Sequence, residues 1–171
     1  MKTSLIVVLC GALLGLASSA LAQSTPPPLP PESHQFDFWI GEWNVTTPDG
    51  KPAGLSKIES VSSGAALLEN WTGLPVPAGG NGKSLNVYNR AKKQWQQFWV
   101  GSGGGVLELA GGLVNGRMVL TGEHRNSKGQ MIEKITWTPN ADGSVRQHWE
   151  QSTDGGQTWT DAFDGLYRKK A

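Results

Sequence analysis

FDFWIGEWNV, residues 36–45, is the stretch that decides the fold of this chain. Trp39 and Trp43 stand four residues apart around a Gly-Glu pair, and Phe36 and Phe38 precede them. Large aromatic side chains bury much apolar surface, so both indoles are expected to be structural. The run that follows, over residues 40–47, is typical of a strand. An aromatic cluster therefore stands at the start of a β domain.

Downstream of this stretch, short runs rich in Val, Ile, Thr, Trp and Leu alternate with turns that contain glycine. Turn dipeptides such as Asn115-Gly116 and Asp142-Gly143 favour the positive φ of tight hairpins. We predict ten strands, at residues 40–47, 54–62, 65–72, 83–89, 95–101, 105–111, 116–124, 130–138, 144–151 and 158–168.

The links between these strands are too short for a parallel sheet, whose crossovers need about a dozen residues or more. The strands are therefore expected to form an antiparallel meander. A twisted meander of this size tends to close, because closure removes the unpaired edge strands. The prediction is an all-β chain folded as an up-and-down barrel of about ten strands, and a sandwich of two sheets is the alternative.

The 171 residues fit one domain preceded by two short segments. Residues 1–22 have the pattern of a removable secretory signal, with a basic start, an apolar run and an Ala-Leu-Ala cleavage site, although an uncleaved anchor is the alternative. Residues 23–33, QSTPPPLPPES, are a proline-rich linker. The barrel domain is assigned to residues 34–171. The expected location is exported, either periplasmic or secreted, with no membrane attachment after cleavage.

Composition excludes several classes of function. The single cysteine, Cys10, lies in the predicted signal, so a mature chain has neither a disulfide nor a reactive thiol. Without Lys2 the basic and acidic residues balance, which argues against a nucleic-acid binder and against a polybasic membrane-surface protein. No metal-ligand spacing and no serine-nucleophile motif is visible, so we predict no metal and no cofactor.

Gly41-Glu42-Trp43 is a G-x-W triplet at the first predicted strand, and Arg168 stands at the end of the last one. In this respect the chain resembles the lipocalins and the wider calycin group. The resemblance implies a barrel whose Trp43 plugs one end, with Arg168 packed across the indole and Gly41 in a structural role. Typical lipocalins also carry a C-terminal helix, which is not expected here.

The stretches FDFWIGEWNV, KSLNVYNRAKKQW, ITWTPNADGSVRQHWEQSTDGGQTW and FDGLYRK resemble, more narrowly, a bacterial family of exported, lipocalin-like domains of unknown function. This resemblance covers nearly all of residues 34–171 and implies the fold but no activity. Nitrobindin-like haem barrels carry further glycines after the tryptophan. This chain has Asn44, Val45 and Thr46 there, so haem is not expected.

Trp95, Gln97 and Trp99 alternate on one face of a predicted strand. An amide between two indoles is unusual in a dry core and suits a cavity wall that binds a flat or amphipathic molecule, although ordinary core packing is the alternative. The pattern leaves open which strand face lines the interior. Further candidates for the wall and its polar contacts are Trp71, Ser84, Asn86, Tyr88, Trp137 and Trp149. By analogy with barrels of this strand number, we predict a binder of one small hydrophobic or amphipathic molecule.

Two other functions stay open. Arg146, His148 and Glu150 alternate on one face of a predicted strand, and a histidine beside a carboxylate can act as a general base. An enzyme with His148 and Glu150 in a polar cavity is therefore the second hypothesis, and a solvated outer face is the plain interpretation of the row. The third hypothesis is a surface binder of glycans or proteins that uses exposed tryptophans. Ligand identity and oligomeric state are not determined by the sequence.

Residues 152–159 fit S-x-D-x-G-x-x-W, which resembles the Asp-box of sialidase propellers. A propeller would repeat this box at the spacing of its blades, and here it occurs once. We interpret it as the hairpin between the last two strands. The resemblance implies that Asp154 accepts backbone donors and that Trp159 packs beneath the turn, without glycosidase activity.

Overall fold

The computed structural model describes residues 27–75, 80–126 and 129–170; the predicted signal, residues 1–22, lies outside them. The prediction of a ten-stranded all-β fold is confirmed. The strands are β1 (Gly41–Thr46), β2 (Pro52–Val61), β3 (Ala66–Gly73), β4 (Asn81–Asn89), β5 (Gln94–Gly101), β6 (Val106–Val114), β7 (Arg117–Asn126), β8 (Gly129–Pro139), β9 (Val145–Ser152) and β10 (Thr160–Lys169).

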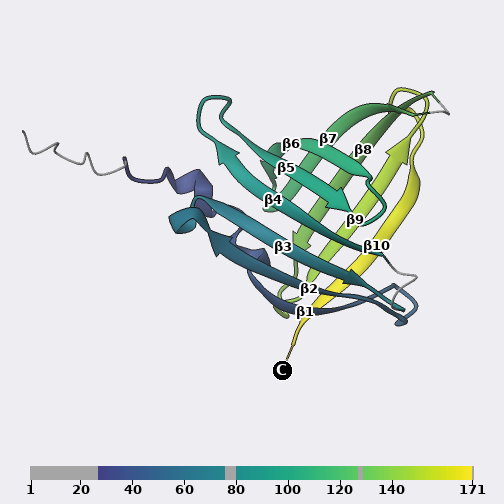
Figure 1. The fold of residues 1–171 in the computed structure, drawn as a ribbon, viewed down its shortest axis with the longest axis horizontal. Coiled ribbons are helices and arrows are strands. Elements are labelled where there is room, and N and C mark those ends of the chain that lie inside the picture. The colour runs from purple at the N-terminus through teal and green to yellow at the C-terminus, as the bar shows by residue number, and fades with distance from the viewer. Residues whose placement is uncertain (1–26, 76–79, 127–128, 171) are drawn as a thin grey trace, which may run out of the picture.

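The strands form one closed antiparallel barrel, in which each strand pairs with its neighbours in sequence and β1 pairs with β10 (Figure 1). The up-and-down barrel is therefore correct, and the two-sheet sandwich is wrong. Local turn chemistry supports this order: Asn115 and Gly116 both have positive φ, 50° and 76°, as a tight hairpin turn between β6 and β7 requires. No helix follows β10 within the described residues.

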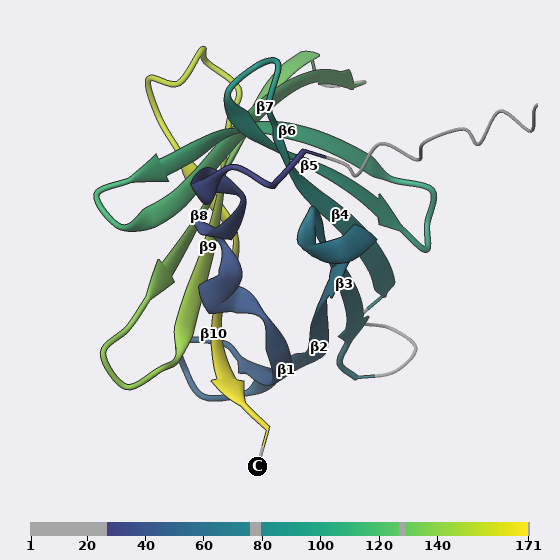
Figure 2. The ribbon, with the colours of Figure 1, turned by 90° about the vertical axis from the view of Figure 1, so that its left-hand side faces the viewer.

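Two short 3-10 helices, η1 (Pro31–His34) and η2 (Asp37–Trp39), lie across one end of the barrel (Figure 2). A third, η3 (Ser62–Gly64), links β2 to β3. The side chain of Ser33 is buried, so the packed domain begins inside the segment that the sequence assigned to the linker.

The aromatic residues of the FDFWIGEW stretch form the plug of this end. Phe36 and Trp39 are fully buried and stack with their ring centroids 5.0 Å apart. The indole Nε1 of Trp43 donates a hydrogen bond of 2.9 Å to the carbonyl of Trp39, which ties the plug to β1. Gly41 has a φ of 144°, which favours glycine. The structural roles of Gly41 and Trp43 stay a prediction.

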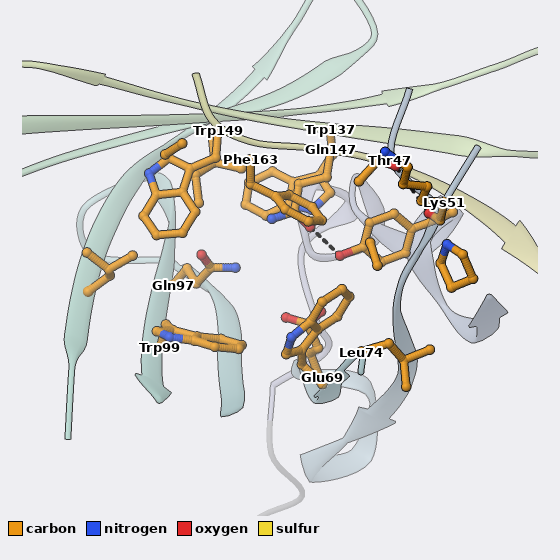
Figure 3. Close-up of a pocket in the computed structure, with 17 residues that line it drawn as sticks. Thr47, Lys51, Glu69, Leu74, Gln97, Trp99, Trp137, Gln147, Trp149 and Phe163 are labelled. Carbon is orange, nitrogen blue, oxygen red and sulfur yellow. Dashed lines mark hydrogen bonds between the residues drawn. The ribbon is translucent and has the colours of Figure 1, made fainter. Parts of the chain in front are cut away.

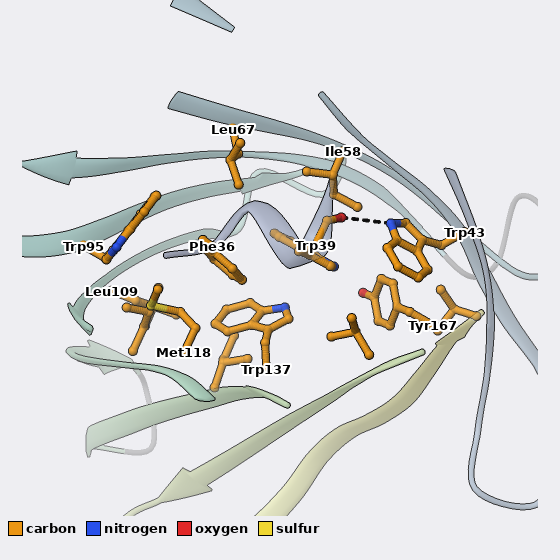
Figure 4. Packing of buried hydrophobic residues seen from close by; sticks show 14 residues of the cluster. Phe36, Trp39, Trp43, Ile58, Leu67, Trp95, Leu109, Met118, Trp137 and Tyr167 are labelled. Atoms are coloured by element: carbon orange, nitrogen blue, oxygen red, sulfur yellow. Dashed lines mark hydrogen bonds between the residues drawn. The ribbon is translucent and has the colours of Figure 1, made fainter. Parts of the chain in front are cut away.

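The hydrophobic core surrounds the plug (Figure 4). Phe36 makes edge contacts with Trp95 of β5 and Trp137 of β8, at centroid distances of 5.6 and 5.1 Å, so side chains of two strands that are not neighbours meet on the same ring. The buried residues of this cluster are Phe36, Trp39, Trp43, Val45, Ile58, Leu67, Trp95, Leu109, Met118, Leu120, Ile135, Trp137, Val145 and Tyr167.

The predicted contact between Arg168 and Trp43 is wrong. The cation over the Trp43 ring is the ammonium of Lys169, 5.5 Å from the ring centroid. Trp43 pairs with Lys169 in the β1–β10 register, whereas Arg168 pairs with Asn44 and is exposed. Because side chains alternate across a strand, this shift of one residue turns Arg168 to the outside of the barrel.

The Asp-box stretch forms the β9–β10 hairpin, as the sequence indicated. Asp154 accepts hydrogen bonds from the Thr158 hydroxyl and from the backbone N–H groups of Thr158 and Gln157, at 2.6, 2.9 and 2.9 Å. These donors, with the Thr158 hydroxyl the strongest, hold the pKa of Asp154 well below its usual range. Trp159 is half-buried beside the turn, with the Lys134 ammonium 3.9 Å from its ring centroid.

Candidate ligand-binding cavity

A cavity of about 540 Å³ lies inside the barrel, and Figure 3 shows the side chains around it. Its size lies within the range of about 300–1,000 Å³ that is usual for small-molecule sites. The polar members of its wall include Glu69, Gln97 and Gln147. Its large side chains are mainly aromatic: Trp71, Trp99, Trp137, Trp149, Phe163 and Tyr167.

Glycines on neighbouring strands let two of these rings lie against the wall. A Cβ atom on Gly54 of β2 would come within 2.3 Å of the Trp71 ring, and one on Gly82 of β4 within 2.1 Å of the Trp99 ring. No real Cβ approaches a ring so closely, so any larger residue would displace the indole. Gly54 and Gly82 therefore help to keep the cavity open.

A row of buried polar side chains crosses the inner wall from β2 to β5. The hydroxyls of Ser56 and Ser84 each donate to one carboxyl oxygen of Glu69, at 2.9 and 3.0 Å. The amide of Asn86 donates to the Ser84 hydroxyl at 2.9 Å, and the amide of Gln97 donates to Asn86 at 2.7 Å. We call these five residues the polar row. Because buried polar groups need partners, its mutual bonds are what allow it to line an apolar barrel.

Glu69 is the acidic member of the polar row, and only 4% of its surface is exposed. Burial raises the pKa of its carboxyl to about 7, against the lowering effect of the bonds from Ser56 and Ser84. The Tyr167 hydroxyl donates to the side-chain oxygen of Gln147 on the opposite wall. Burial, together with the nearby charge of Glu69, raises the pKa of Tyr167 well above its usual value.

A second buried carboxyl, Glu133 on β8, holds one of the wall indoles in place. Its oxygens accept hydrogen bonds from Trp149 Nε1 at 2.5 Å and from Gln151 Nε2 at 3.1 Å. His124 Nδ1 lies 3.7 Å from the same carboxyl. Glu133 therefore positions the Trp149 ring that faces the cavity.

The predicted wall residues divide into two groups. Trp71, Gln97, Trp99 and Trp137 line the cavity, so the inward face of β5 is the one that carries Gln97. Their contact with a ligand stays a prediction.

Trp95 and Tyr88, by contrast, belong to the closed end. The Trp95 side chain is 1% exposed, its Nε1 donates to Gln35 at 3.3 Å, and the Tyr88 ring packs edge-on against it at 6.2 Å. Trp95 is the second residue of β5 and packs on Phe36 of the plug, because a strand that spans the barrel contributes both to the core and to the cavity.

His148 and Glu150 lie on the outer face of β9, whereas Gln147 and Trp149 of the same strand line the cavity. His148 Nε2 is 2.8 Å from Asp161, and Lys134 pairs with Glu150 at 3.0 Å. The hypothesis of an acid–base pair in a polar cavity is therefore wrong for these two residues. The row is a network of surface ion pairs.

The surface-platform hypothesis also lacks its central requirement. All eight tryptophans are described, and each is buried or half-buried, so none presents an exposed indole face.

Sequence reasoning missed Glu69 and Glu133. Each of them alternates with inward apolar residues, as in Leu67-x-Glu69-x-Trp71, and an acidic residue at an inward position is the signal that would have found them.

Within residues 27–75, 80–126 and 129–170, no helix is long and apolar enough to cross a membrane. In the same part of the chain, no cluster of three or more His, Cys, Asp or Glu side chains is arranged to hold a metal ion. A comparison with protein-family models finds no matching family, and a comparison with curated proteins finds no similar sequence.

Proposed function

We propose that this protein binds one small hydrophobic or amphipathic molecule in the cavity of its barrel. The observation that carries the proposal is the set of aromatic side chains around a space of about 540 Å³, because a small molecule there would bury its apolar surface against these rings. Rings from β3, β5, β8, β9 and β10 face the same space, so a ligand there would be surrounded on several sides (Figure 3).

Polar groups on the wall suit a ligand with one polar end. Glu69 and Gln97 lie on one side of the cavity and Gln147 on the other, among the apolar rings (Figure 3). A few placed polar groups in an apolar pocket are the usual means of orienting a small molecule. An amphipathic ligand therefore fits the wall better than a purely apolar one.

Titration of the full chain with N-phenylnaphthylamine, a neutral apolar fluorophore, tests this proposal. Saturable fluorescence with one site per chain is the expected result. Trp99→Ala should weaken binding because it removes an indole from the wall, whereas Trp159→Ala, on the β9–β10 hairpin, should leave binding unchanged. Circular dichroism checks that both variants are folded. A signal that rises linearly without saturation would overturn the proposal.

Two further assignments belong with this proposal. The pattern of residues 1–22 supports export, so the site would operate in a periplasm or outside the cell. The G-x-W triplet at a plugged, closed antiparallel barrel supports membership of the exported, lipocalin-like family that the chain resembles. Mass spectrometry of the secreted chain would test the first, since the expected N-terminus is Gln23.

A further inference from the structure

The polar row has a direction. Gln97 donates to Asn86, Asn86 donates to Ser84, and Ser84 donates to Glu69, while Ser56 donates to Glu69 from the other side. Every bond of the row therefore leads a donor toward the carboxyl. Such an arrangement favours negative charge on Glu69, because hydrogen bonds to the charged form stabilise it.

The acceptor capacity of Glu69 is only half used. A carboxylate has about four lone-pair positions, and the two serine hydroxyls take one on each oxygen. No lysine, arginine or histidine of the described residues pairs with this carboxyl. Lys51 at the rim of the cavity pairs instead with Asp49, at 2.7 Å. The protein thus leaves a buried carboxyl in the cavity wall without a counter-ion.

Aromatic rings stand beside Glu69 in the cavity wall. Trp71 stands two residues after Glu69 on the same inward face of β3, and its ring meets that of Phe163 edge-on at 5.8 Å. Aromatic faces attract cations, and aromatic walls with a nearby carboxylate are suited to bind ammonium groups. The cavity therefore combines one anionic group with several electron-rich faces.

We infer that the ligand of this cavity is an organic cation, an amphipathic amine or quaternary ammonium whose charged head pairs with Glu69 and lies against the Trp71 ring. This inference rests on the proposed function and names the chemical class of its ligand. The apolar body of such a molecule would lie among Trp99, Trp137 and Trp149 (Figure 3).

The ionisation of Glu69 gives the inference a pH signature. Because burial raises the pKa of this carboxyl to about 7, a permanent cation must bind the ionised form and release a proton below that pH. Affinity for a quaternary ammonium should then rise up to about tenfold per pH unit below pH 7 and level off above it. The other ionisable groups that point inward or stand at the rim are Lys51, His124, Glu133, Tyr167 and Lys169.

The test uses three probes with the same alkyl chain, namely octyltrimethylammonium, octanol and octanoate, in displacement of N-phenylnaphthylamine from the full chain. The cation is expected to bind roughly tenfold tighter than octanol, and octanoate weakest. Glu69→Gln keeps the shape and should abolish the preference for the cation. Glu59→Gln, a carboxyl paired with Lys57 on the outer face of β2, is the matched control and should leave the preference intact.

The outcomes separate this inference from the proposed function. If octanol binds as tightly as the cation, the inference is wrong while the cavity binder stands. If the fluorophore itself does not bind saturably, both are wrong. Should Glu69→Gln fail to fold, the pH dependence of the wild-type chain decides: affinity for octyltrimethylammonium that does not change between about pH 5 and pH 8 would overturn the inference.

Discussion

Replacing Glu69 with Gln should raise the stability of the barrel at neutral and alkaline pH. The carboxyl is buried in an apolar wall, and its ionised form has two serine donors but no counter-ion. Gln has nearly the same shape, and a serine hydroxyl can rotate to accept its amide hydrogen. The substitution therefore removes the charge while it keeps the packing.

The size of the effect follows from the pKa of Glu69. Burial raises this pKa from 4.5 to about 7, so between these values the folded chain holds a proton that the unfolded chain has released. The contribution of Glu69 to the free energy of unfolding is greatest at and below the lower value, falls as pH rises to about 7, and then stays constant. At about 1.4 kcal/mol per pKa unit, the free energy of unfolding drops by about 3 kcal/mol over this window.

Urea unfolding of the wild-type chain and of Glu69→Gln, from about pH 5 to pH 8, measures this loss directly. The variant's advantage should grow by roughly 2–3 kcal/mol across the range. Carboxyls that lose their stabilising bonds in acid, such as Asp154, are present in both proteins and cancel in the difference. An advantage that stays constant with pH would refute the assignment of a raised pKa to Glu69, and Glu59→Gln on the outer face should show no such trend.

Two further variants test the cavity wall and the terminal hairpin. Gly82→Ala should lower the free energy of unfolding by about 1–3 kcal/mol, because its Cβ would fall 2.1 Å from the Trp99 ring. Gly112→Ala, whose Cβ would meet nothing within 4 Å, is the control, and equal urea stabilities of the two would contradict the reasoning. Asp154→Asn should lower the melting temperature at neutral pH by weakening the charge-assisted bonds of the β9–β10 turn. Because the pKa of Asp154 is depressed, the difference from wild type should hold above about pH 5 and shrink below about pH 4, and a difference that persists in strong acid would contradict it.

The fold was predictable because its signals are local. Most of the links between strands carry a glycine or asparagine, and Asn115-Gly116 adopts the positive φ values that these residue types favour. Short links then leave only an antiparallel order, and closure follows from edge pairing. The residue that covers Trp43 was not predictable in this way. A shift of one residue in the β1–β10 register decides whether Arg168 or Lys169 faces inward.

The cavity was predictable only in part, because alternation shows which residues share a face but not how deep each one lies. Trp95 and Trp99 share the inward face of β5, yet one packs on the plug and the other lines the cavity. The depth is set by where η1 and η2 end, and this is a tertiary contact. The hydrogen-bonded burial of Glu69 was not predictable for a similar reason, since its donors Ser56 and Ser84 come from two other strands.

The two effects of Glu69→Gln have opposite signs, and together they distinguish a structural carboxyl from one that serves a ligand. A carboxyl whose ionised form is destabilised by about 3 kcal/mol is a poor choice for the fold alone, because Gln would make the same bonds without the desolvation cost. If Glu69 serves only the fold, the variant gains stability and binds cation and alcohol alike, as the wild type does. If Glu69 receives a cation, the variant gains stability and loses the cation's advantage, which makes the unfavourable burial of this charge part of the binding site.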